Sequence, residues 1–146
     1  MKIAIAADHG GFELKSVIIE HLTKKGHEVI NLGTDSSDSV DYSDFAEKCA
    51  AEVLSNEASF GIVVCGTGIG ISIAANKIKG IRCALCYSPE TAALAKQHNN
   101  ANIISLGGRT TSDEMALKIV DSFMEAEFEG GRHQRRIDKI MALETK

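Results

Sequence analysis

The chain has 146 residues, of which 44% are hydrophobic and 25% are charged, and its formal net charge at neutral pH is −4. A net negative charge argues against nucleic acid or an anionic membrane as the main partner. A chain of this length is the size of a single domain, which we expect over residues 1–146, and its core needs no disulfide or metal. The first residues turn polar too soon for a signal peptide, so we expect a cytoplasmic protein whose cysteines are thiols.

Short apolar segments rich in Ile and Val alternate with segments whose apolar residues have helical spacing. The apolar segments predict strands at residues 2–7, 27–32, 60–65, 82–87 and 102–107. The other segments predict helices at residues 11–26, 42–55, 70–78, 88–98 and 111–128. This alternation is typical of an α/β fold, and we expect a Rossmann-like three-layer α/β/α sandwich around a five-stranded parallel sheet. Residues 129–146 have no further strand to lead into and predict an outlying C-terminal helix.

No charged residue occurs in the segment 58–76, which is about as long as a membrane span. Its glycines, Thr67 and Ser72 divide it into a strand, a loop and a helix start, so we expect no membrane partner. Cys83 and Cys86 match the C-x-x-C pattern of redox and metal sites. They lie in a predicted strand, where residues three apart point to opposite faces, so these two sulfurs cannot share a metal.

Polar residues follow the predicted strands at their carboxyl ends, which meet at one edge of a parallel sheet. They are Asp8 and His9 after the first strand, Tyr42 after the second, Cys65, Gly66, Thr67, Gly68 and Gly70 at the third, and Arg109 after the fifth. Packing of an apolar core does not explain why an acid, an imidazole, a phenol, a thiol, a hydroxyl and a guanidinium lie in one place. We therefore interpret this edge as the candidate site.

The loop Gly66–Gly70 allows three interpretations. A dinucleotide fingerprint needs G-x-G-x-x-G after the first strand, whereas this match follows the third strand and has Ile71 where the last glycine belongs. A non-enzymatic module would carry these residues as ordinary loop residues. An anion nest would use the N–H groups at a helix start to hold a phosphate or a developing oxyanion. A thiol beside such a nest is a suitable base for proton abstraction next to a carbonyl.

Four segments resemble the family of ribose-5-phosphate isomerase type B, which also includes allose-6-phosphate and galactose-6-phosphate isomerase subunits. The segments are AADHGGFELK, CGTGIGISIAANK, KQHNNANI and EGGRHQRRI, and the resemblance covers essentially the whole chain. It implies an enzyme that interconverts aldose and ketose phosphates through a cis-enediolate, with no metal or coenzyme. The expected reaction interconverts D-ribose 5-phosphate and D-ribulose 5-phosphate in the pentose phosphate pathway. The alternatives are an isomerase of allose 6-phosphate or galactose 6-phosphate and a phospho-ligand-binding module without activity.

The resemblance also implies roles for single residues. Cys65 is the expected base that shuttles the proton between C1 and C2, Thr67 helps to position it, and the amides around Gly66, Gly68 and Gly70 hold the enediolate. His98 is expected to open the furanose ring, assisted by Asp8 or Thr67, while Asn99 holds a sugar oxygen. The expected phosphate ligands are His9, Arg109, Arg132 and Arg136, and the residues expected to line the pocket are Tyr42 and His133.

The order of the elements separates His98 from Cys65 within one chain. Cys65 ends a strand at the carboxyl edge of the sheet, whereas His98 ends a helix that starts at this edge and runs back to the opposite one. If both act on one sugar, His98 comes from a second chain, and Arg132 and Arg136 on the outlying segment do too. We therefore expect a homodimer or a dimer of dimers with active sites shared between subunits.

Overall fold

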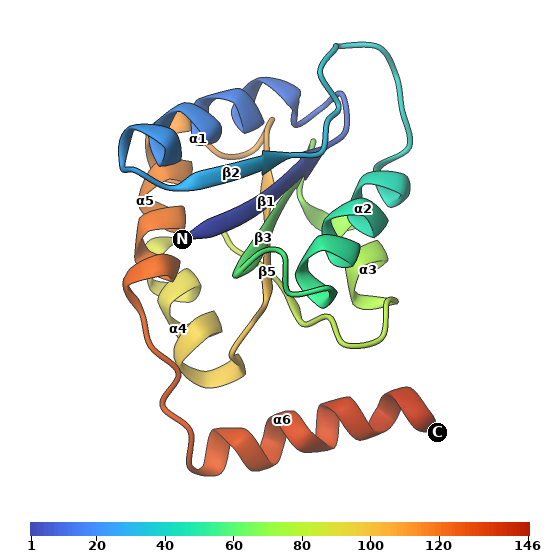
Figure 1. Cartoon of the computed structure of the whole chain (residues 1–146), viewed down its shortest axis with the longest axis vertical. Helices are drawn as coiled ribbons and strands as arrows, with labels where there is room; N and C mark the ends of the chain where they lie inside the picture. The colour runs from blue at the N-terminus through green and yellow to red at the C-terminus, as the bar shows by residue number, and fades with distance from the viewer.

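The computed structural model describes residues 1–146 and has a five-stranded parallel sheet at its centre. The strand order is β2-β1-β3-β5-β4 (Figure 1). The strands are β1 (Lys2–Ala7), β2 (Glu28–Asn31), β3 (Phe60–Cys65), β4 (Cys83–Leu85) and β5 (Ile103–Gly107). The three central strands are buried along almost their whole length, which is why they appear in the sequence as continuous apolar runs.

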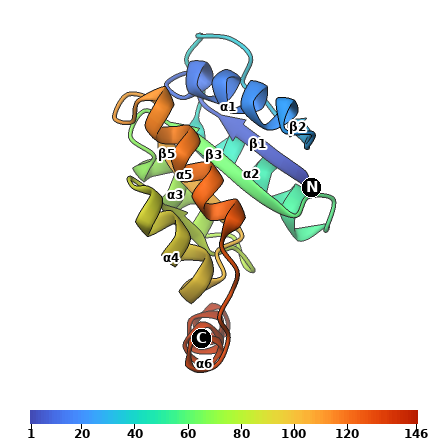
Figure 2. The same cartoon turned by 90° about the vertical axis from the view of Figure 1, so that its left-hand side faces the viewer.

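Helices cover both faces of the sheet and give three layers (Figures 1 and 2). They are α1 (Phe12–Lys24), α2 (Tyr42–Leu54), α3 (Ile69–Asn76), α4 (Pro89–Asn99), α5 (Asp113–Glu125) and α6 (Arg132–Ala142), with a short 3-10 helix at Leu143–Thr145. One apolar core joins α1, α4 and α5 to the sheet through side chains such as Ile18, Ala95 and Ile119. A second core, which includes Cys49 and Ile71, joins α2 and α3 to the other face. The predicted α/β/α sandwich is confirmed.

Several predicted elements are shorter in the structure, including the helix 11–26, which is Phe12–Lys24. The predicted strands 27–32 and 82–87 are Glu28–Asn31 and Cys83–Leu85, and the predicted helix 111–128 is Asp113–Glu125. Both shortened strands lie at the edges of the sheet, where each pairs with one neighbour only. The helix begins after Ser112 because the Ser112 hydroxyl accepts the Met115 N–H at 3.2 Å and so caps the first turn.

The structure tests two further predictions, that the segment 58–76 does not span a membrane and that the two sulfurs of the C-x-x-C pair lie on opposite faces of the sheet. No helix of the structure is both long and apolar enough to cross a membrane. The uncharged segment instead contains β3, the glycine loop and α3. Cys86 belongs to the core under α1, α4 and α5, whereas Cys83 packs against the core under α2 and α3. The two sulfurs therefore lie on opposite faces of the sheet.

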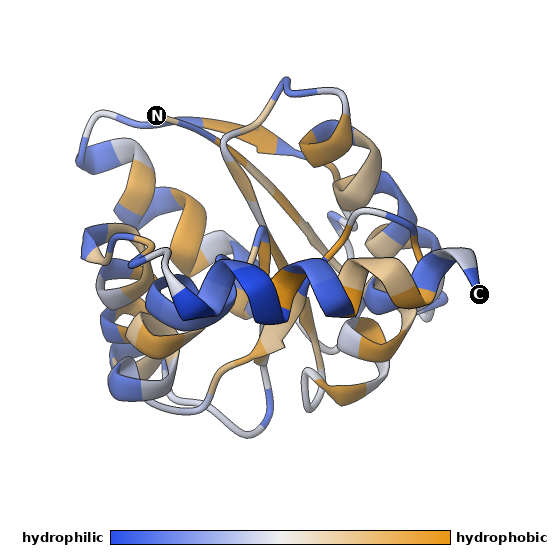
Figure 3. Ribbon diagram, turned by 90° about the horizontal axis from the view of Figure 1, so that it is seen from below, coloured by the Kyte–Doolittle hydropathy of each residue, from blue (hydrophilic) through white to orange (hydrophobic).

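The last helix, α6, lies apart from the sandwich, as the sequence predicted (Figure 1). It follows Gly130 and Gly131, both of which have positive φ. Viewed from below, its first half is mostly hydrophilic and apolar residues follow toward its end (Figure 3). The apolar side chains of Ile140 on α6 and Leu143 on the following 3-10 helix are 45% and 62% exposed. One polar contact to the sandwich is the Glu144 carboxylate, which accepts the Gly80 N–H at 2.8 Å.

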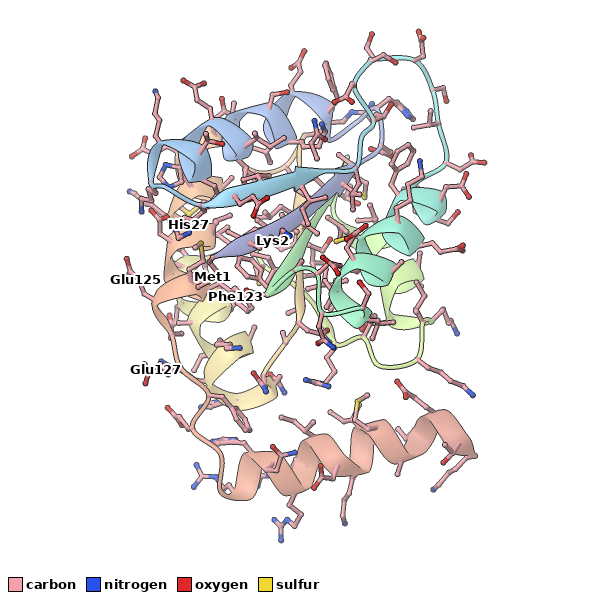
Figure 4. All side chains as sticks on the ribbon, in the orientation of Figure 1. Met1, Lys2, His27, Phe123, Glu125 and Glu127 are labelled. Atoms are coloured by element: carbon pink, nitrogen blue, oxygen red, sulfur yellow. The ribbon has the colours of Figure 1, made fainter.

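The helix α5 presents an apolar side to the sheet and an acidic side to the outside. Phe123 points inward, and its ring centroid lies 5.1 Å from that of Phe60 on β3 (Figure 4). Glu125 and Glu127, at the end of the helix and just after it, point outward (Figure 4). This arrangement leads the chain along the outside of the sandwich toward α6.

An acidic residue of α5, Asp121, joins this helix to α1. Its Oδ1 lies 2.8 Å from His21 Nε2 and 2.9 Å from Lys25 Nζ. Burial raises the pKa of Asp121, but the hydrogen bonds and charges of Lys25 and His21 outweigh burial and hold that pKa below its usual range. A carboxylate of this kind stabilises the fold above its ordinary pKa of about 3.9, and the stabilisation is lost as the pH falls through the lower folded-state value.

We expect Asp121→Asn to lower the free energy of unfolding by about 1 kcal/mol at neutral pH. The difference from the unchanged protein should shrink as the pH is lowered below about 4, because both proteins then carry a neutral group at this position. Urea unfolding at a series of pH values measures both quantities. A difference that stays constant down to about pH 2 would contradict this account of Asp121.

Candidate active site

The loops after β1, β3 and β5 meet at the carboxyl edge of the sheet and bind one another through their backbones. The Asp8 N–H donates to the Val64 carbonyl at 3.1 Å. The Gly108 N–H donates to the Cys65 carbonyl at 2.7 Å, and the Arg109 N–H donates to the Gly66 carbonyl at 2.9 Å. The middle loop is therefore fixed on both sides, which gives the candidate site a rigid base.

Cys65 is the last residue of β3, and its side chain is buried below the start of α3. The Gly68 N–H donates to the Cys65 sulfur, with the nitrogen 3.2 Å from Sγ. The helix α3 begins at the next residue, Ile69, so the sulfur lies at the N-terminus of a helix. Backbone N–H groups and the helix dipole favour negative charge at this position. Cys65 therefore lies where the Gly68 N–H and the start of α3 face its sulfur.

Contacts with neighbouring residues limit the space at two of the loop glycines, and the sequence did not reveal these contacts. Gly68 has a φ of +80°, and a Cβ there would lie 2.8 Å from the carbonyl carbon of Leu106. A Cβ on Gly70 would lie 2.7 Å from the ring of Tyr42, the first residue of α2. Gly68 therefore needs glycine before any ligand is considered, whereas a side chain on Gly70 would require the exposed ring of Tyr42 to move.

We expect Gly68→Ala to lower kcat/KM by about tenfold or more, because the positive φ and the clash at Leu106 both displace the N–H that faces Cys65. Gly26→Ala is the matched control. Gly26 has a similar φ of +89°, but no atom lies within 4 Å of the added Cβ, and the residue follows α1 far from the loop. Equal loss of activity in both variants would show that backbone strain alone, and not the geometry at the sulfur, causes the effect.

Two further residues support the glycine loop, although the sequence interpretation did not select them. The Tyr87 hydroxyl donates to the Thr67 carbonyl at 2.6 Å. The Ser105 hydroxyl, on the fully buried strand β5, donates to the Gly68 carbonyl. A serine inside an otherwise apolar strand was the available signal for Ser105. No comparable signal marked Tyr87, because it ends an apolar run that a strand alone explains.

The expected phosphate ligands of the first and fifth loops lie together. Asp8 is buried, and its Oδ1 accepts the N–H groups of Gly10 and Gly11 at 2.8 and 3.1 Å. The Val40 N–H donates to His9 Nδ1 at 3.2 Å, so a neutral His9 ring carries its proton on Nε2. A small pocket of about 220 Å³ beside these loops has His9, Ser37 and Arg109 in its wall, together with the acidic Glu13.

A second group of expected site residues lies at the end of α4 and the start of α6. The rings of His98 and His133 stack with their centroids 4.3 Å apart and their planes 10° apart. Burial lowers the pKa of His133, the positive charges of His98, Arg132 and Arg136 lower it further, and the Glu129 carboxylate opposes them. Asn99 is the last residue of α4, next to His98 in the sequence, and lines a cavity together with Arg82 and Ile140.

The structure separates the two groups within one chain, as the order of the elements predicted. The helix α4 has 11 residues and spans about 16 Å, and it leads from the carboxyl edge of the sheet back to the opposite edge. Figure 1 shows the carboxyl ends of β1 and β3 pointing away from α6. The group at the carboxyl edge contains Asp8, His9, Tyr42, Cys65, Gly66, Thr67, Gly68, Gly70 and Arg109. The group at the opposite edge contains His98, Asn99, Arg132, His133 and Arg136.

A buried thiol at a helix N-terminus, a loop of glycine amides and nearby cationic side chains suit acid–base chemistry on a small anionic substrate. The fold and the site together define the class, an α/β enzyme with its site at the carboxyl edge of a parallel sheet. The family model described as Ribose/Galactose Isomerase matches residues 3–140, and the chain belongs to this family.

Individual members of this family are similar to the chain over nearly its whole length. Ribose-5-phosphate isomerase B of Escherichia coli (strain K12) is 48% identical over 145 residues, which cover 99% of this chain and 97% of that protein. The structure of ribose-5-phosphate isomerase B from Clostridium thermocellum has a TM-score of 0.98 and 52% identity, with 99% and 98% of the two chains covered. The structure of the Mycoplasma genitalium enzyme with bound ribulose-5-phosphate has a TM-score of 0.95 and 50% identity, covering 99% and 97%.

Proposed function

We propose that this chain is a ribose-5-phosphate isomerase that interconverts D-ribose 5-phosphate and D-ribulose 5-phosphate. The observation that carries the proposal is the Cys65 thiol, which faces the Gly68 N–H at the start of α3. The chain also shares 48% and 52% of its residues with two ribose-5-phosphate isomerases of type B. The structure with bound ribulose-5-phosphate, from a protein that shares 50% of its residues with this chain, supports the same substrate. The family model spans residues 3–140, which supports a single isomerase domain.

The proposed reaction moves one proton between neighbouring carbons of the open-chain sugar. The Cys65 thiolate takes the proton from C2 of the aldose, and the electron pair of that C–H bond forms the enediolate C=C bond. Amides around Gly66, Gly68 and Gly70 hold the negative oxygen, while Thr67 positions the sulfur and the sugar oxygens. The protonated Cys65 then returns the proton to C1, while the hydroxyl proton on the C2 oxygen passes to the C1 oxygen, which leaves the C2 carbonyl of the ketose. No step uses a metal or a coenzyme.

Ring opening and phosphate binding complete the proposed reaction. His98 opens the furanose, assisted by Asp8 or Thr67, and Asn99 holds a sugar oxygen. A His9 ring whose Nδ1 accepts the Val40 N–H has its Nε2–H to donate to an acceptor such as a phosphate oxygen, which supports its proposed role as a phosphate ligand. The other proposed phosphate ligands are Arg109, Arg132 and Arg136, and the residues proposed to line the pocket are Tyr42 and His133.

We propose that two chains share each site, in a homodimer or a dimer of dimers. The separation of His98 from Cys65 within one chain supports this assembly, because both residues must reach one sugar. Exposed apolar side chains supply a surface for it: Ile69 and Ile73 on α3 are 47% and 57% exposed, close to the glycine loop. Burial of such side chains against a second chain would stabilise the assembly.

The family also handles six-carbon sugars, and its model description includes galactose isomerase. This chain carries Cys65, His98 and the arginines together, which favours an enzyme that needs no second kind of subunit. We propose that it works in the cytoplasm, in the pentose phosphate pathway.

Steady-state kinetics on three substrates tests the proposal. We expect kcat/KM to be highest for ribose 5-phosphate, lower for allose 6-phosphate and lowest for galactose 6-phosphate. A higher kcat/KM for either six-carbon phosphate would show that this sugar, and not ribose 5-phosphate, is the preferred substrate. Binding of ribose 5-phosphate without turnover of any of the three would support the non-enzymatic module instead.

A further inference from the structure

Two histidines and a glutamate bring three metal-ligating atoms together at the edge of the sheet opposite Cys65. Glu129 Oε1 lies 3.4 Å from His133 Nε2 and 3.7 Å from His98 Nε2. One ligating atom from each residue fits within a span of 4.8 Å. His98 comes from α4 and His133 from α6, so the cluster lies where these two helices meet.

We propose that His98, Glu129 and His133 form an inhibitory binding site for a divalent transition-metal ion, with Zn²⁺ as the preferred physiological ion. Two imidazoles and one carboxylate are a ligand set that holds zinc in proteins and leaves a fourth position open. Bonds of about 2.0–2.2 Å in a tetrahedral site place neighbouring ligand atoms about 3.3 Å apart. The two distances to the Glu129 oxygen are close to this spacing.

The backbone holds the three residues near one another without a metal. The Glu129 N–H donates to the Gln97 carbonyl at 3.0 Å, which ties the segment before α6 to the last turn of α4. The His133 N–H donates to the Gly130 carbonyl at 3.1 Å. Because a metal binds in the plane of an imidazole ring, coordination would turn the rings out of their parallel stack. The His98 side chain is 41% exposed and has room to turn.

The surrounding charges and ligand types determine which ions fit. Arg132 and Arg136 lie on the same helix as His133 and oppose any cation. Mg²⁺ and Ca²⁺ prefer six or more oxygen ligands, and one carboxylate does not supply them. Imidazole ligands favour Zn²⁺, Ni²⁺, Cu²⁺ and Co²⁺, because covalent bonds to nitrogen offset part of the charge repulsion.

The inhibition, unlike the binding, rests on the proposed function. His98 and His133 are proposed to open the sugar ring and to line the pocket, and a metal would take the nitrogen lone pairs that this requires. The reaction itself uses no metal, so the ion only blocks it. A chelator such as EDTA should therefore restore full activity.

Cobalt(II) is the probe that tests binding without any activity measurement. We expect the visible d–d bands of a tetrahedral Co²⁺ site to appear on titration of the full-length protein, and Zn²⁺ to displace the Co²⁺. Glu129→Gln should weaken Co²⁺ binding by about tenfold or more. Glu127→Gln is the matched control, because Glu127 lies two residues away, points outward and is outside the cluster (Figure 4). His133→Asn should remove the bands and keeps the test valid if the Glu129 variant is unstable.

The Cys65 thiol is the competing ligand, and the same spectra distinguish it. A thiolate ligand adds an intense near-ultraviolet charge-transfer band, which the proposed set of nitrogen and oxygen ligands does not produce. Bands that include this feature and persist in Glu129→Gln would overturn the proposal, as would the absence of any bands. In activity assays, Zn²⁺ that inhibits the unchanged enzyme tenfold should inhibit Glu129→Gln by about twofold or less. Failure of isomerase activity altogether would refute the proposed function and leave the Co²⁺ result standing.

Discussion

Replacement of Cys65 by alanine should lower kcat by about 10²–10⁴-fold, because it removes the group proposed to carry the proton. The sulfur is buried at the end of β3, and the Gly68 N–H faces it at 3.2 Å, so the substitution removes the group that lies at the start of α3. Water could replace the lost volume, but it is a weaker base than a thiolate. The measurement is steady-state conversion of ribose 5-phosphate, with circular dichroism to show that the variant folds.

Cys86→Ala is the control for the loss of a buried thiol. Burial raises the pKa of Cys86 to about 11 and that of Cys49 to about 12, so both thiols stay protonated at neutral pH and cannot act as bases. Cys86 lies in the core on the face of the sheet under α1, α4 and α5, outside the candidate site. We expect this variant to keep its kcat within about twofold. Activity of Cys65→Ala within tenfold of the unchanged enzyme would remove Cys65 from the proposed mechanism.

A mixed assembly of two inactive variants should recover activity that neither has alone. In the proposed homodimer, Cys65→Ala and His98→Ala chains are each expected to be inactive, because every shared site lacks one of the two groups. In a purified mixed dimer, one site combines the intact Cys65 of one chain with the intact His98 of the other. The second site combines both defects. We therefore expect about half of the activity of the unchanged dimer, which is a large gain over either variant.

The mixed dimer is best made by co-expression with two different affinity tags and sequential purification. A mixture of the two homodimers, kept from exchanging chains, is the control and should stay inactive. Activity of the mixed dimer no higher than that of this control would place His98 and Cys65 in separate functions. The separation of the two residues within one chain would then have another explanation.

Most of the fold follows from local patterns in the sequence. Buried strands such as residues 60–65 are continuous apolar runs, and the alternation with helical segments determines a parallel sheet. Edge strands were predicted too long, since an apolar run does not show how many neighbours a strand has. The position of His98 followed from topology alone, because a helix after β4 must return to the opposite edge of the sheet.

The contacts that support the site were less accessible to prediction. Gly70 was interpreted through a bound ligand, but its contact with the ring of Tyr42 joins residues far apart in the sequence. Lys15 is another example, since it reads as a surface residue of a helix and yet is 1% exposed. Its Nζ donates to Asn31 Oδ1 at 2.8 Å and Asp35 Oδ1 at 3.0 Å, which anchors the loop after β2. Contacts between residues far apart in the sequence depend on the assembled fold, and hydrophobic periodicity and residue propensity do not predict them.

Proton NMR of ribose 5-phosphate in D₂O with a catalytic amount of the enzyme tests the central claim most directly. A thiol that carries the proton through an enediolate exchanges it with solvent, so the product should be ribulose 5-phosphate with deuterium at C1. The same incubation with Cys65→Ala should give neither product nor exchange. Ribulose 5-phosphate with an undeuterated C1, even after the reaction has been held at equilibrium, would contradict proton transfer through Cys65 and indicate a direct hydride shift.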